Sequence, residues 1–391
     1  MQWIRLRSIV RHAEARSPYY RDAFRAAGFS SVDLRSWDDL KLIPPTPRPA
    51  LQGSETLIAN GYDRARLHRS HTSGSTGMPT TTFFDGRAWT LGRKVLKARA
   101  RFACGLRPWD RVAVFQENVP AGFRVGATGR LASASIHRPP GELVDALVRF
   151  APTTLYGPPS HLDQLGQTGI ELPHLRLVFT SAETLDGATR RRLTDGFGTE
   201  PLDIYGCTEV KEVAWQCGER GAYHVNAEWL IVEVSDLERA PSVPAGSILI
   251  TALYNRAMPL LRYAVGDTGQ AVQGGCPCGR GLPLMFPVLG RSVDYLRLPR
   301  GDFLSPYTLT CAVEAVRGMR QYQIVQRVAH EVSVLVVPDR SFTDDTPRAI
   351  RAALSSHLAG LTVRVELVEI IPREPSGKFR IVRTELHDRP R

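Results

Sequence analysis

The chain lacks the long apolar segments that membrane proteins need. Among its 391 residues, 43% of them hydrophobic, no run reaches the roughly 18 uninterrupted apolar residues of a membrane-spanning helix. The first residues carry Arg5, Arg7 and Arg11 where a secretory signal peptide needs an apolar stretch. We therefore expect a globular protein that is neither exported nor inserted into a membrane, and we expect it in the cytoplasm.

Cysteine is scarce, and two common catalytic patterns are missing. Six cysteines in a chain of this length are too few for a disulfide scaffold, so they are expected to be thiols or metal ligands. No lysine follows Gly77 in the position that a Walker A loop requires, and no Gly-x-Ser-x-Gly segment is present. These absences argue against P-loop NTPases and serine hydrolases.

Lysine is rare as well, although the chain is basic. Only five of the 50 basic residues are lysine, and the net charge is +11. The charge is spread along the chain without a polybasic run. It fits anionic small substrates such as nucleotides, and it also fits nucleic-acid binding. An arginine-rich coding bias is the third explanation, and the charge alone does not separate them.

Short apolar runs alternate with amphipathic segments from about residue 67 to residue 290. The expected order is strand at 111–115, helix at 143–151, strands at 153–157 and 175–183, and helix at 188–198. Strands that alternate with helices indicate an α/β fold with a mainly parallel sheet. The first 30 residues are expected to be helical up to Gly28.

The pattern changes near residue 290. Two apolar runs at 322–328 and 332–339 predict a hairpin, and they are followed by an expected helix at 345–360 and a strand at 362–372. This ββαβ unit is long enough to form its own domain. The sequence therefore predicts a large N-terminal α/β domain over 1–290 and a small, mobile C-terminal α+β domain over 291–391.

Hydroxyl groups and glycines interleave from His71 to Thr80, directly after an expected strand. Glycines let backbone N–H groups approach a phosphate, and the hydroxyls add further donors. Taken alone, this string also fits a flexible Ser/Gly turn. The segment is a candidate phosphate-binding loop.

Two later segments carry carboxylates. Tyr205 to Glu209 follows an apolar strand, and parallel sheets bind ligands at the carboxyl ends of their strands. A ring, a hydroxyl and a carboxylate there suit a nucleotide and its Mg²⁺. In the segment Arg262 to Thr268, Asp267 follows a glycine and can accept two ribose hydroxyls, the alternative being an Asx turn.

A turn near the C-terminus presents one of the few lysines. The segment Pro372 to Arg380 places Lys378 between proline, glycine and serine residues instead of on a helix face. An ammonium group held on such a loop can neutralise charge that builds up on a phosphoryl or carboxyl oxygen. The alternative is an ordinary surface lysine.

Four residues have the composition of a zinc site. Cys217 precedes His224 by seven residues, and Cys276 and Cys278 flank one proline. Three thiolates and one imidazole form the tetrahedral set of a structural zinc ion. The alternative is four unrelated residues, two of them buried thiols. The remaining cysteines, Cys104, Cys207 and Cys311, are expected to be core or loop thiols.

In their order along the chain, these segments resemble the adenylate-forming superfamily, the acyl-CoA synthetases and their relatives. The resemblance rests on Thr72 to Gly77, on Tyr205 to Glu209, on Tyr263 to Asp267 and on Pro372 to Lys378. The turn Tyr156 to Ser160 and the run from Cys276 to Leu296 are similar to the phenylacetate-CoA ligase and coenzyme F390 synthetase branch.

The resemblance implies a two-step reaction. A carboxylate attacks the α-phosphate of ATP to give an acyl-adenylate and pyrophosphate, and a thiol then takes the acyl group. It implies ATP, Mg²⁺ and coenzyme A, with an aromatic acid as the favoured substrate. The alternatives are transfer to a carrier protein or an amine, or transfer of AMP itself. The protein is expected to form a homodimer. The distant alternative to an enzyme is a basic protein that binds nucleic acid.

The same resemblance implies roles for individual residues. The residues that would contact the phosphates are Thr72, Ser73, Gly74, Ser75, Thr76 and Gly77. Those that would flank the adenine are Ser181, Ala182, Glu183, Tyr205 and Gly206. Thr208 and Glu209 would serve phosphate and Mg²⁺, Asp267 and Arg291 would bind the ribose, and Lys378 would bridge carboxylate and phosphate in the first step.

Overall fold

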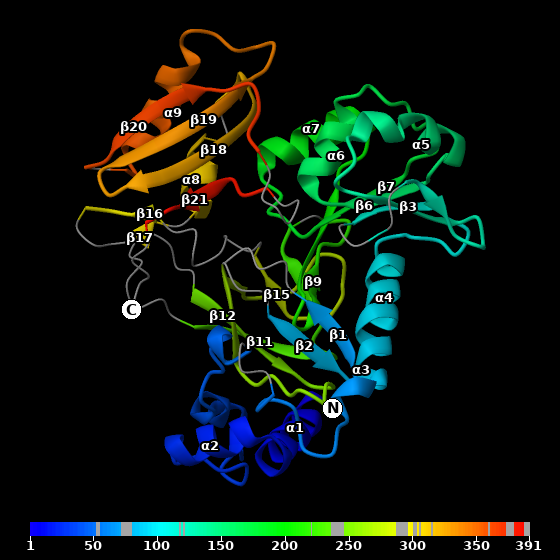
Figure 1. Cartoon of the computed structure of the whole chain (residues 1–391), viewed down its shortest axis with the longest axis vertical. Coiled ribbons are helices and arrows are strands. Elements are labelled where there is room, and N and C mark those ends of the chain that lie inside the picture. Colours follow the sequence, from blue (N-terminus) through cyan, green and yellow to red (C-terminus); the bar gives the residue numbers. More distant parts are fainter. Residues whose placement is uncertain are drawn as a thin grey trace. The chain divides into compact units, whose positions relative to one another are not determined.

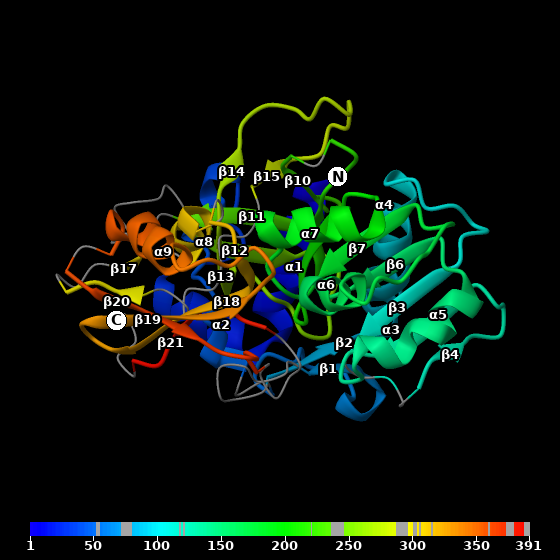
Figure 2. The same ribbon diagram turned by 90° about the horizontal axis from the view of Figure 1, so that it is seen from above.

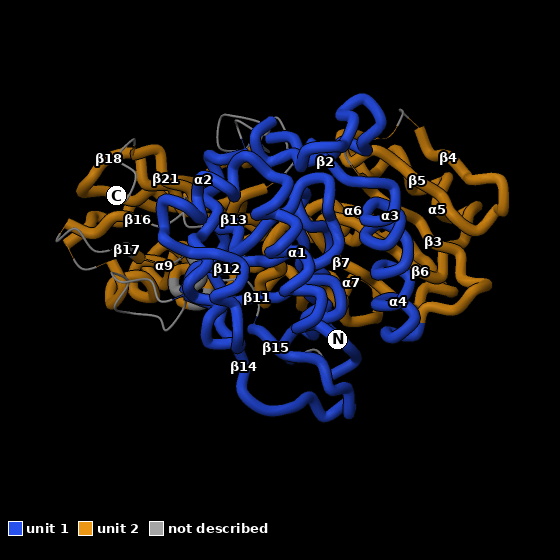
Figure 3. The backbone as a smooth tube through the Cα atoms, turned by 90° about the horizontal axis from the view of Figure 1, so that it is seen from below, with its two compact units in different colours: residues 1–105, 204–236, 246–287 blue, residues 106–203, 237–245, 288–391 orange. Residues whose placement is uncertain are grey.

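In the computed structural model, the chain folds into two compact units (Figure 3). Unit 1 comprises residues 1–105, 204–236 and 246–287, and unit 2 comprises residues 106–203, 237–245 and 288–391. The structure describes residues 1–51, 55–71, 80–116, 119, 122–219, 221–235, 246–286, 296–299, 303–304, 306–313, 316–358, 360–372 and 379–386. The predicted boundary between residues 290 and 291 lies outside these ranges, so the two-domain limits stay a prediction.

Unit 1 begins with two helices, α1 (Gln2–Arg16) and α2 (Pro18–Ala27), where the sequence predicted a helical segment up to residue 30. The helices are separate because Ser17 precedes a proline, which disfavours helical backbone at that position. Ser17 is accordingly extended, with φ −92° and ψ 120°. The second helix ends as expected at Gly28, which takes the left-handed conformation with φ 62°.

The proline-rich segment that follows contains only short 3-10 turns, η1 (Trp37–Leu42) and η2 (Arg48–Leu51), with η3 (Arg64–Arg66) after them. This segment packs against the strand that carries Asp267. Thr46 bridges to Tyr263, and the Tyr20 hydroxyl lies 2.8 Å from Thr46 Oγ1 and accepts the backbone N–H of Leu261. The N-terminal helices therefore support a strand more than 200 residues away.

Unit 1 contains three groups of antiparallel strands. The first is a hairpin of β1 (His68–His71) and β2 (Thr81–Phe84). The second is the sheet β11 (Leu230–Ser235), β12 (Gly246–Ala252) and β13 (Tyr263–Gly269). The third runs from β8 (Leu202–Cys207) through β9 (Lys211–Trp215), β10 (Tyr223–Val225) and β15 (Leu284–Met285) to β14 (Ala271–Val272). Helical segments α3 (Gly86–Thr90), η4 (Leu91–Val95) and α4 (Leu96–Ala103) follow β2.

Unit 2 contains the three parallel strands that the sequence predicted and a fourth, at 131–135, that it did not. Their order is β5 (Leu131–Ser135), β3 (Val112–Gln116), β6 (Thr154–Gly157) and β7 (Leu177–Ser181), with β4 (Arg124–Val125) antiparallel at the edge. The helical segments are η5 (Pro140–Leu143), α5 (Val144–Phe150), α6 (Pro159–Gly166) and α7 (Gly187–Phe197), and α6 lies beside α7 (Figures 1 and 2). Apolar strand residues such as Phe115 and Val178 form a buried core with Leu147, Leu162 and Leu193 of the helices.

The C-terminal part of unit 2 has its own sheet and core. Its elements are β16 (Leu296–Arg297), β17 (Phe303–Leu304), α8 (Pro306–Val313), β18 (Met319–Val328), β19 (Glu331–Pro338), α9 (Thr346–Ser355), β20 (Thr362–Leu367) and β21 (Val382–Thr384). The strand order is β20-β19-β18-β21. The predicted hairpin is antiparallel, and α9 connects β19 to the parallel strand β20. Helix residues Ile350 and Leu354 are buried in this core.

These elements confirm the predicted α/β class with a small C-terminal α/β part. The antiparallel strands of unit 1 were not predicted, because apolar runs of similar length occur in both kinds of sheet. Among the helices of the described ranges, none is long and apolar enough to cross a bilayer.

Candidate active site

The carboxylate of Asp267 is held by a buried tyrosine. Tyr205 lies in β8 and Asp267 in β13, and the Tyr205 hydroxyl donates a hydrogen bond of 2.8 Å to Asp267 Oδ2. Burial, followed by the Asp267 charge, raises the pKa of Tyr205 well above its usual value, so the phenol stays protonated and remains a donor. Residues 62 positions apart are thus joined in one hydrogen-bonded pair.

A second buried tyrosine holds the other carboxylate. Tyr263 donates 2.9 Å to Glu209 Oε1, and both side chains are almost fully buried. Burial, followed by the Glu209 charge, raises the pKa of Tyr263 above its usual value. The neighbouring thiol of Cys207 also has a raised pKa, mainly because it is buried. Cys207 is therefore a protonated thiol and an unsuitable nucleophile.

Gly206 is required by the close approach of two strands. A Cβ atom at this position would lie 2.6 Å from the carbonyl oxygen of Lys211, closer than any real Cβ contact. The strands β8 and β9 pair here with a register shift between Tyr205 and Gly206. The glycine therefore lets β8 approach the start of β9 this closely.

In unit 2, Ser181 ends β7, and Ala182 and Glu183 follow it. Ala182 has φ 76°, a left-handed conformation that is rare for a residue with a side chain and often marks a functional site. Glu183 accepts two backbone N–H groups, from Ser160 at 3.1 Å and from Phe379 at 2.9 Å. Phe379 directly follows Lys378, so Glu183 holds one end of the C-terminal lysine segment.

Three parts of the predicted site lie outside the described residues. These are Thr72 to Gly77, Arg291 and Lys378. The described strands bracket the first of them, because His71 and Thr81 are the last pair of the β1–β2 hairpin. His71 Nδ1 lies 2.9 Å from Thr81 Oγ1, which closes the base of the connecting segment.

Lys211 was not among the residues predicted from the sequence. Its Nζ donates to Ser70 Oγ at 2.6 Å and to the Thr208 carbonyl at 3.0 Å. Burial lowers the pKa of Lys211 to about 8, which leaves the amine mostly protonated at neutral pH. One sequence signal pointed to it: Lys211 is one of five lysines and follows Thr208-Glu209 by two residues.

The four predicted zinc ligands converge within unit 1. Their ligand atoms, from Cys217, His224, Cys276 and Cys278, all lie within 4.8 Å of one another. The Cys217 and Cys276 sulfurs are 3.6 Å apart, and Cys278 Sγ lies 3.4 Å from His224 Nε2. A tetrahedral zinc ion with Zn–S bonds of about 2.3 Å separates its sulfur ligands by about 3.7 Å. These two separations are close to those between the ligands of a zinc ion.

The shifted pKa values of His224 and Cys278 also favour the protonation states that metal ligands need. Burial, with help from Arg280 and Arg99, lowers the pKa of His224, so the imidazole is neutral as a metal ligand must be. Burial opposes the thiolate of Cys278, but hydrogen bonds from Arg280 outweigh it and lower the pKa of Cys278 to about 7. At least one sulfur is thus readily deprotonated.

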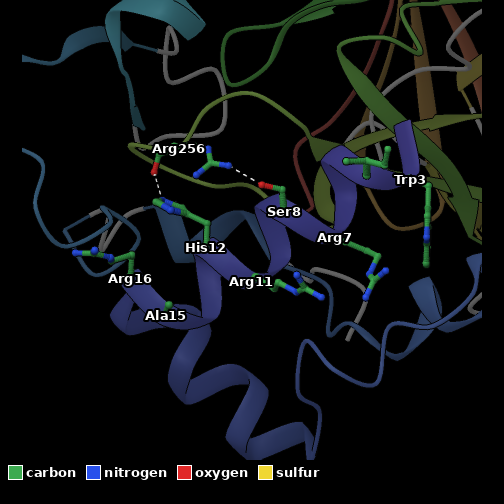
Figure 4. Close-up of a pocket in the computed structure, with 9 residues that line it drawn as sticks. Trp3, Arg7, Ser8, Arg11, His12, Ala15, Arg16 and Arg256 are labelled. Atoms are coloured by element: carbon green, nitrogen blue, oxygen red, sulfur yellow. Dashed lines mark hydrogen bonds between the residues drawn. The ribbon is translucent and has the colours of Figure 1, made fainter. Parts of the chain in front are cut away.

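A separate hollow of about 490 Å³ lies on the outer face of α1 and is lined by none of the motif residues. Arg256 is fixed there, since its guanidinium donates to Ser8 Oγ and its carbonyl lies 2.9 Å from His12 Nε2 (Figure 4). The side chain of Arg16 points away from those of Arg7 and Arg11 (Figure 4). The arginines therefore do not converge on one anion.

Comparisons with known families agree with the motif geometry. Residues 70–252 match the model of the AMP-binding enzyme family, and residues 296–385 match the CapK C-terminal domain. Residues 70–252 are therefore similar to the AMP-binding enzymes. The chain is 28% identical to a phenylacetate-coenzyme A ligase of Thermus thermophilus over 98% of this chain and 95% of that protein. It is also 22% identical to the protein CapK of Staphylococcus aureus over 81% of this chain and 74% of that protein.

Solved structures support the same fold. A 2-hydroxyisobutyryl-CoA ligase in complex with 2-HIB-AMP is similar with a TM-score of 0.82 and 21% identity, over 98% of this chain and 89% of that one. An anthranilate CoA ligase in complex with anthranoyl-AMP gives a TM-score of 0.59 and 17% identity, over 82% and 67% of the two chains. At these identities the likeness concerns the fold.

Proposed function

We propose that the protein is an AMP-forming ligase that activates a carboxylic acid with ATP and transfers the acyl group to coenzyme A. The observation that carries the proposal is the pair of motif carboxylates, Asp267 and Glu209, each held by a buried tyrosine hydroxyl. Both lie in segments that match the adenylate-forming pattern. The names of the relatives favour phenylacetate or a similar aromatic acid as substrate.

In the first step, a carboxylate oxygen of the acid attacks the α-phosphorus of ATP, and the bond from that phosphorus to pyrophosphate breaks. The hydroxyls and N–H groups of Thr72 to Gly77 would hold the phosphates. The Lys378 ammonium would offset the charge that builds up between carboxylate and phosphate. No covalent enzyme intermediate is needed, because positioning and charge neutralisation suffice.

The nucleotide would be held by groups from several segments. Asp267 would accept hydrogen bonds from the ribose hydroxyls, since a carboxylate has acceptor capacity beyond the bond from Tyr205, and Arg291 would donate to a ribose oxygen. Ser181 to Glu183 and Tyr205 with Gly206 would lie beside the adenine. Thr208 would contact a phosphate, and the Glu209 carboxylate offers the oxygen ligand that Mg²⁺ prefers. Bound Mg²⁺ would neutralise phosphate charge.

In the second step, the thiol sulfur attacks the carbonyl carbon of the acyl-adenylate, and the bond from that carbon to the AMP oxygen breaks. A second candidate places a carrier protein or an amine in the role of acceptor. Release of AMP measured with and without coenzyme A separates the two acceptors.

The proposed activity is tested by acid-dependent exchange of pyrophosphate into ATP. A panel of aromatic and short aliphatic acids should contain at least one that drives exchange, and an aryl acid is expected to drive it fastest. Exchange reports the first step whatever the acceptor is. Failure of every acid, with protein that is folded and free of bound nucleotide, would contradict the proposal.

We also propose that Cys217, His224, Cys276 and Cys278 bind a structural zinc ion. A site in which all four ligands are protein leaves no open position for catalysis. The ion would tie the segment around Cys276 to β9 and β10 without contact with Asp267 or Lys378. Its role would be to stabilise unit 1.

The protein is therefore expected to purify with about one equivalent of zinc, and Cys276→Ser should lose most of it. The variant should lower the melting temperature by roughly 5 °C or more, since each kcal/mol shifts it by about 2–4 °C in a folding unit of about 150–250 residues. Turnover per folded molecule should change much less.

Elemental analysis and a melting curve check this prediction. Cys104→Ser is the matched control, because Cys104 lies outside the cluster and its Sγ donates to the Gln216 carbonyl. It should keep its zinc. A wild-type preparation without metal, with all four ligands free to react, would remove the site.

A further inference from the structure

Lys211 joins two of the motif segments through one buried ammonium group. It opens β9, two residues after Glu209, and its Nζ donates to Ser70 Oγ at 2.6 Å and to the Thr208 carbonyl at 3.0 Å. The ammonium lies 4.4 Å from the centroid of the Phe84 ring and 5.0 Å from that of Trp89. Aromatic faces attract a cation in this position. Lys211 therefore has two acceptors and two rings around its charge.

The surrounding backbone is shaped to accommodate this lysine. Lys211 has φ +70°, which is rare for a residue with a long side chain. Gly92 lies beside its stem, where a Cβ atom would come within 3.2 Å of Lys211 Cγ. Gly206 faces its carbonyl, as described above. Neighbouring residues thus hold Lys211 in an uncommon conformation instead of leaving it on the surface.

The Lys211 contact reaches the strand that leads into the candidate phosphate loop. β1 and β2 form a two-stranded sheet of their own, and an isolated hairpin is only marginally stable. β2 is anchored by Asn255, whose Nδ2 donates to the Phe83 carbonyl at 2.8 Å. β1 is largely exposed, and the bond from Lys211 to Ser70 ties it to the chain segment of Thr208.

We infer that Lys211 is a positioning residue for ATP, because its ammonium holds β1, and with it the entry to the loop at 72–77, against the main chain of Thr208. The inference rests on the proposed function, in which that loop and Thr208 both serve the phosphates of ATP. Lys211 acts through these segments and need not touch the substrate.

The inference predicts an effect confined to steps that use the whole triphosphate. The loop would hold phosphates that leave as pyrophosphate in the first step, and an acyl-adenylate lacks them. Loss of the ammonium should therefore weaken ATP binding and slow adenylate formation. Acyl transfer from an added acyl-adenylate should stay within about threefold of wild type.

Lys211→Met is the sharpest variant. Methionine keeps an unbranched stem over Phe84 and Trp89 and carries the same backbone penalty at positive φ, but it has no charge and no N–H group. The dissociation constant for ATP, measured by calorimetric titration without acid, should rise about tenfold, as expected for the loss of one charged hydrogen bond. KM for ATP in pyrophosphate exchange should rise in parallel.

Ser70→Ala removes the β1 acceptor and should give part of the same effect. The double variant should then weaken ATP binding no more than Lys211→Met alone, because both changes break one contact. Lys94→Met is the matched control, since Lys94 is exposed on η4, and it should bind ATP like wild type. If Lys211→Met does not fold, Ser70→Ala on its exposed strand measures the same bond.

Several results would overturn the inference. The first is that folded Lys211→Met binds ATP within twofold of the wild-type affinity; if that variant does not fold, the same result in Ser70→Ala counts. The second is that Lys211→Met loses adenylate formation and acyl transfer equally. The third is that the effects of the two substitutions on ATP affinity are fully additive in the double variant. The proposed function is tested separately, because it fails if the wild-type protein shows no acid-dependent pyrophosphate exchange. In that case the ATP titration still tests the role of Lys211. Wild-type protein that binds no ATP would overturn both.

Discussion

Replacing Lys378 by alanine is expected to lower the rate of adenylate formation by about 10²–10³-fold, the loss typical when one preorganised charge donor is removed from a reacting centre. Transfer of the acyl group from an added acyl-adenylate should remain largely intact. The reason is that in the proposed mechanism the ammonium would offset charge in the first step, whereas the C-terminal domain, proposed to be mobile, would move before a thiol enters.

Pyrophosphate exchange measures the first step and thioester formation from synthetic acyl-adenylate measures the second. Lys41→Ala is a suitable control, because Lys41 lies in the 3-10 turn η1 and in none of the motifs. It should behave like wild type in both assays. Equal loss of both steps in Lys378→Ala would contradict the division of labour between them.

Replacing Asp267 by alanine should weaken ATP binding by about 10- to 150-fold. That range corresponds to roughly 1.5–3 kcal/mol, the contribution of hydrogen bonds to a charged group. The carboxylate would accept the ribose hydroxyls, and it is held in place by the Tyr205 hydroxyl at 2.8 Å. ATP affinity by calorimetric titration and KM for ATP in exchange both report the change.

Tyr205→Phe separates ribose binding from local disturbance. It removes the hydroxyl that donates to Asp267 but keeps both the ring and the carboxylate, so its effect on ATP affinity should be several-fold smaller than that of Asp267→Ala. Melting curves should show both variants folded. Unchanged ATP saturation in Asp267→Ala would show that the ribose role is wrong.

The parallel part of the fold could be predicted because its signals are local. The run at 111–115 became β3 (Val112–Gln116), and the amphipathic segment at 188–198 became α7 (Gly187–Phe197) with Asp186 as its cap. The antiparallel sheet of β11, β12 and β13 was missed, although its pairing joins residues only 12 to 23 positions apart. No local period tells a buried antiparallel strand from a parallel one.

The candidate site divides in the same way. Asp267 and Glu209 could be found because motif spacing marks them, and Cys276 and Cys278 because one proline separates them. The pairing of these carboxylates with the hydroxyls of Tyr205 and Tyr263 could not, since each pair joins residues that are 54 or 62 positions apart. Lys211 escaped prediction for the same reason: its acceptor Ser70 lies 141 residues away.

One isotope measurement tests the central proposal most directly. The acid that drives exchange is prepared with both carboxylate oxygens as ¹⁸O and is incubated with ATP, Mg²⁺ and coenzyme A. If a carboxylate oxygen attacks the α-phosphorus and the thiol later breaks the carbon–oxygen bond, one ¹⁸O atom stays on phosphorus. The account predicts AMP that carries one ¹⁸O for each thioester formed. Unlabelled AMP, or ADP as the nucleotide product, would contradict it.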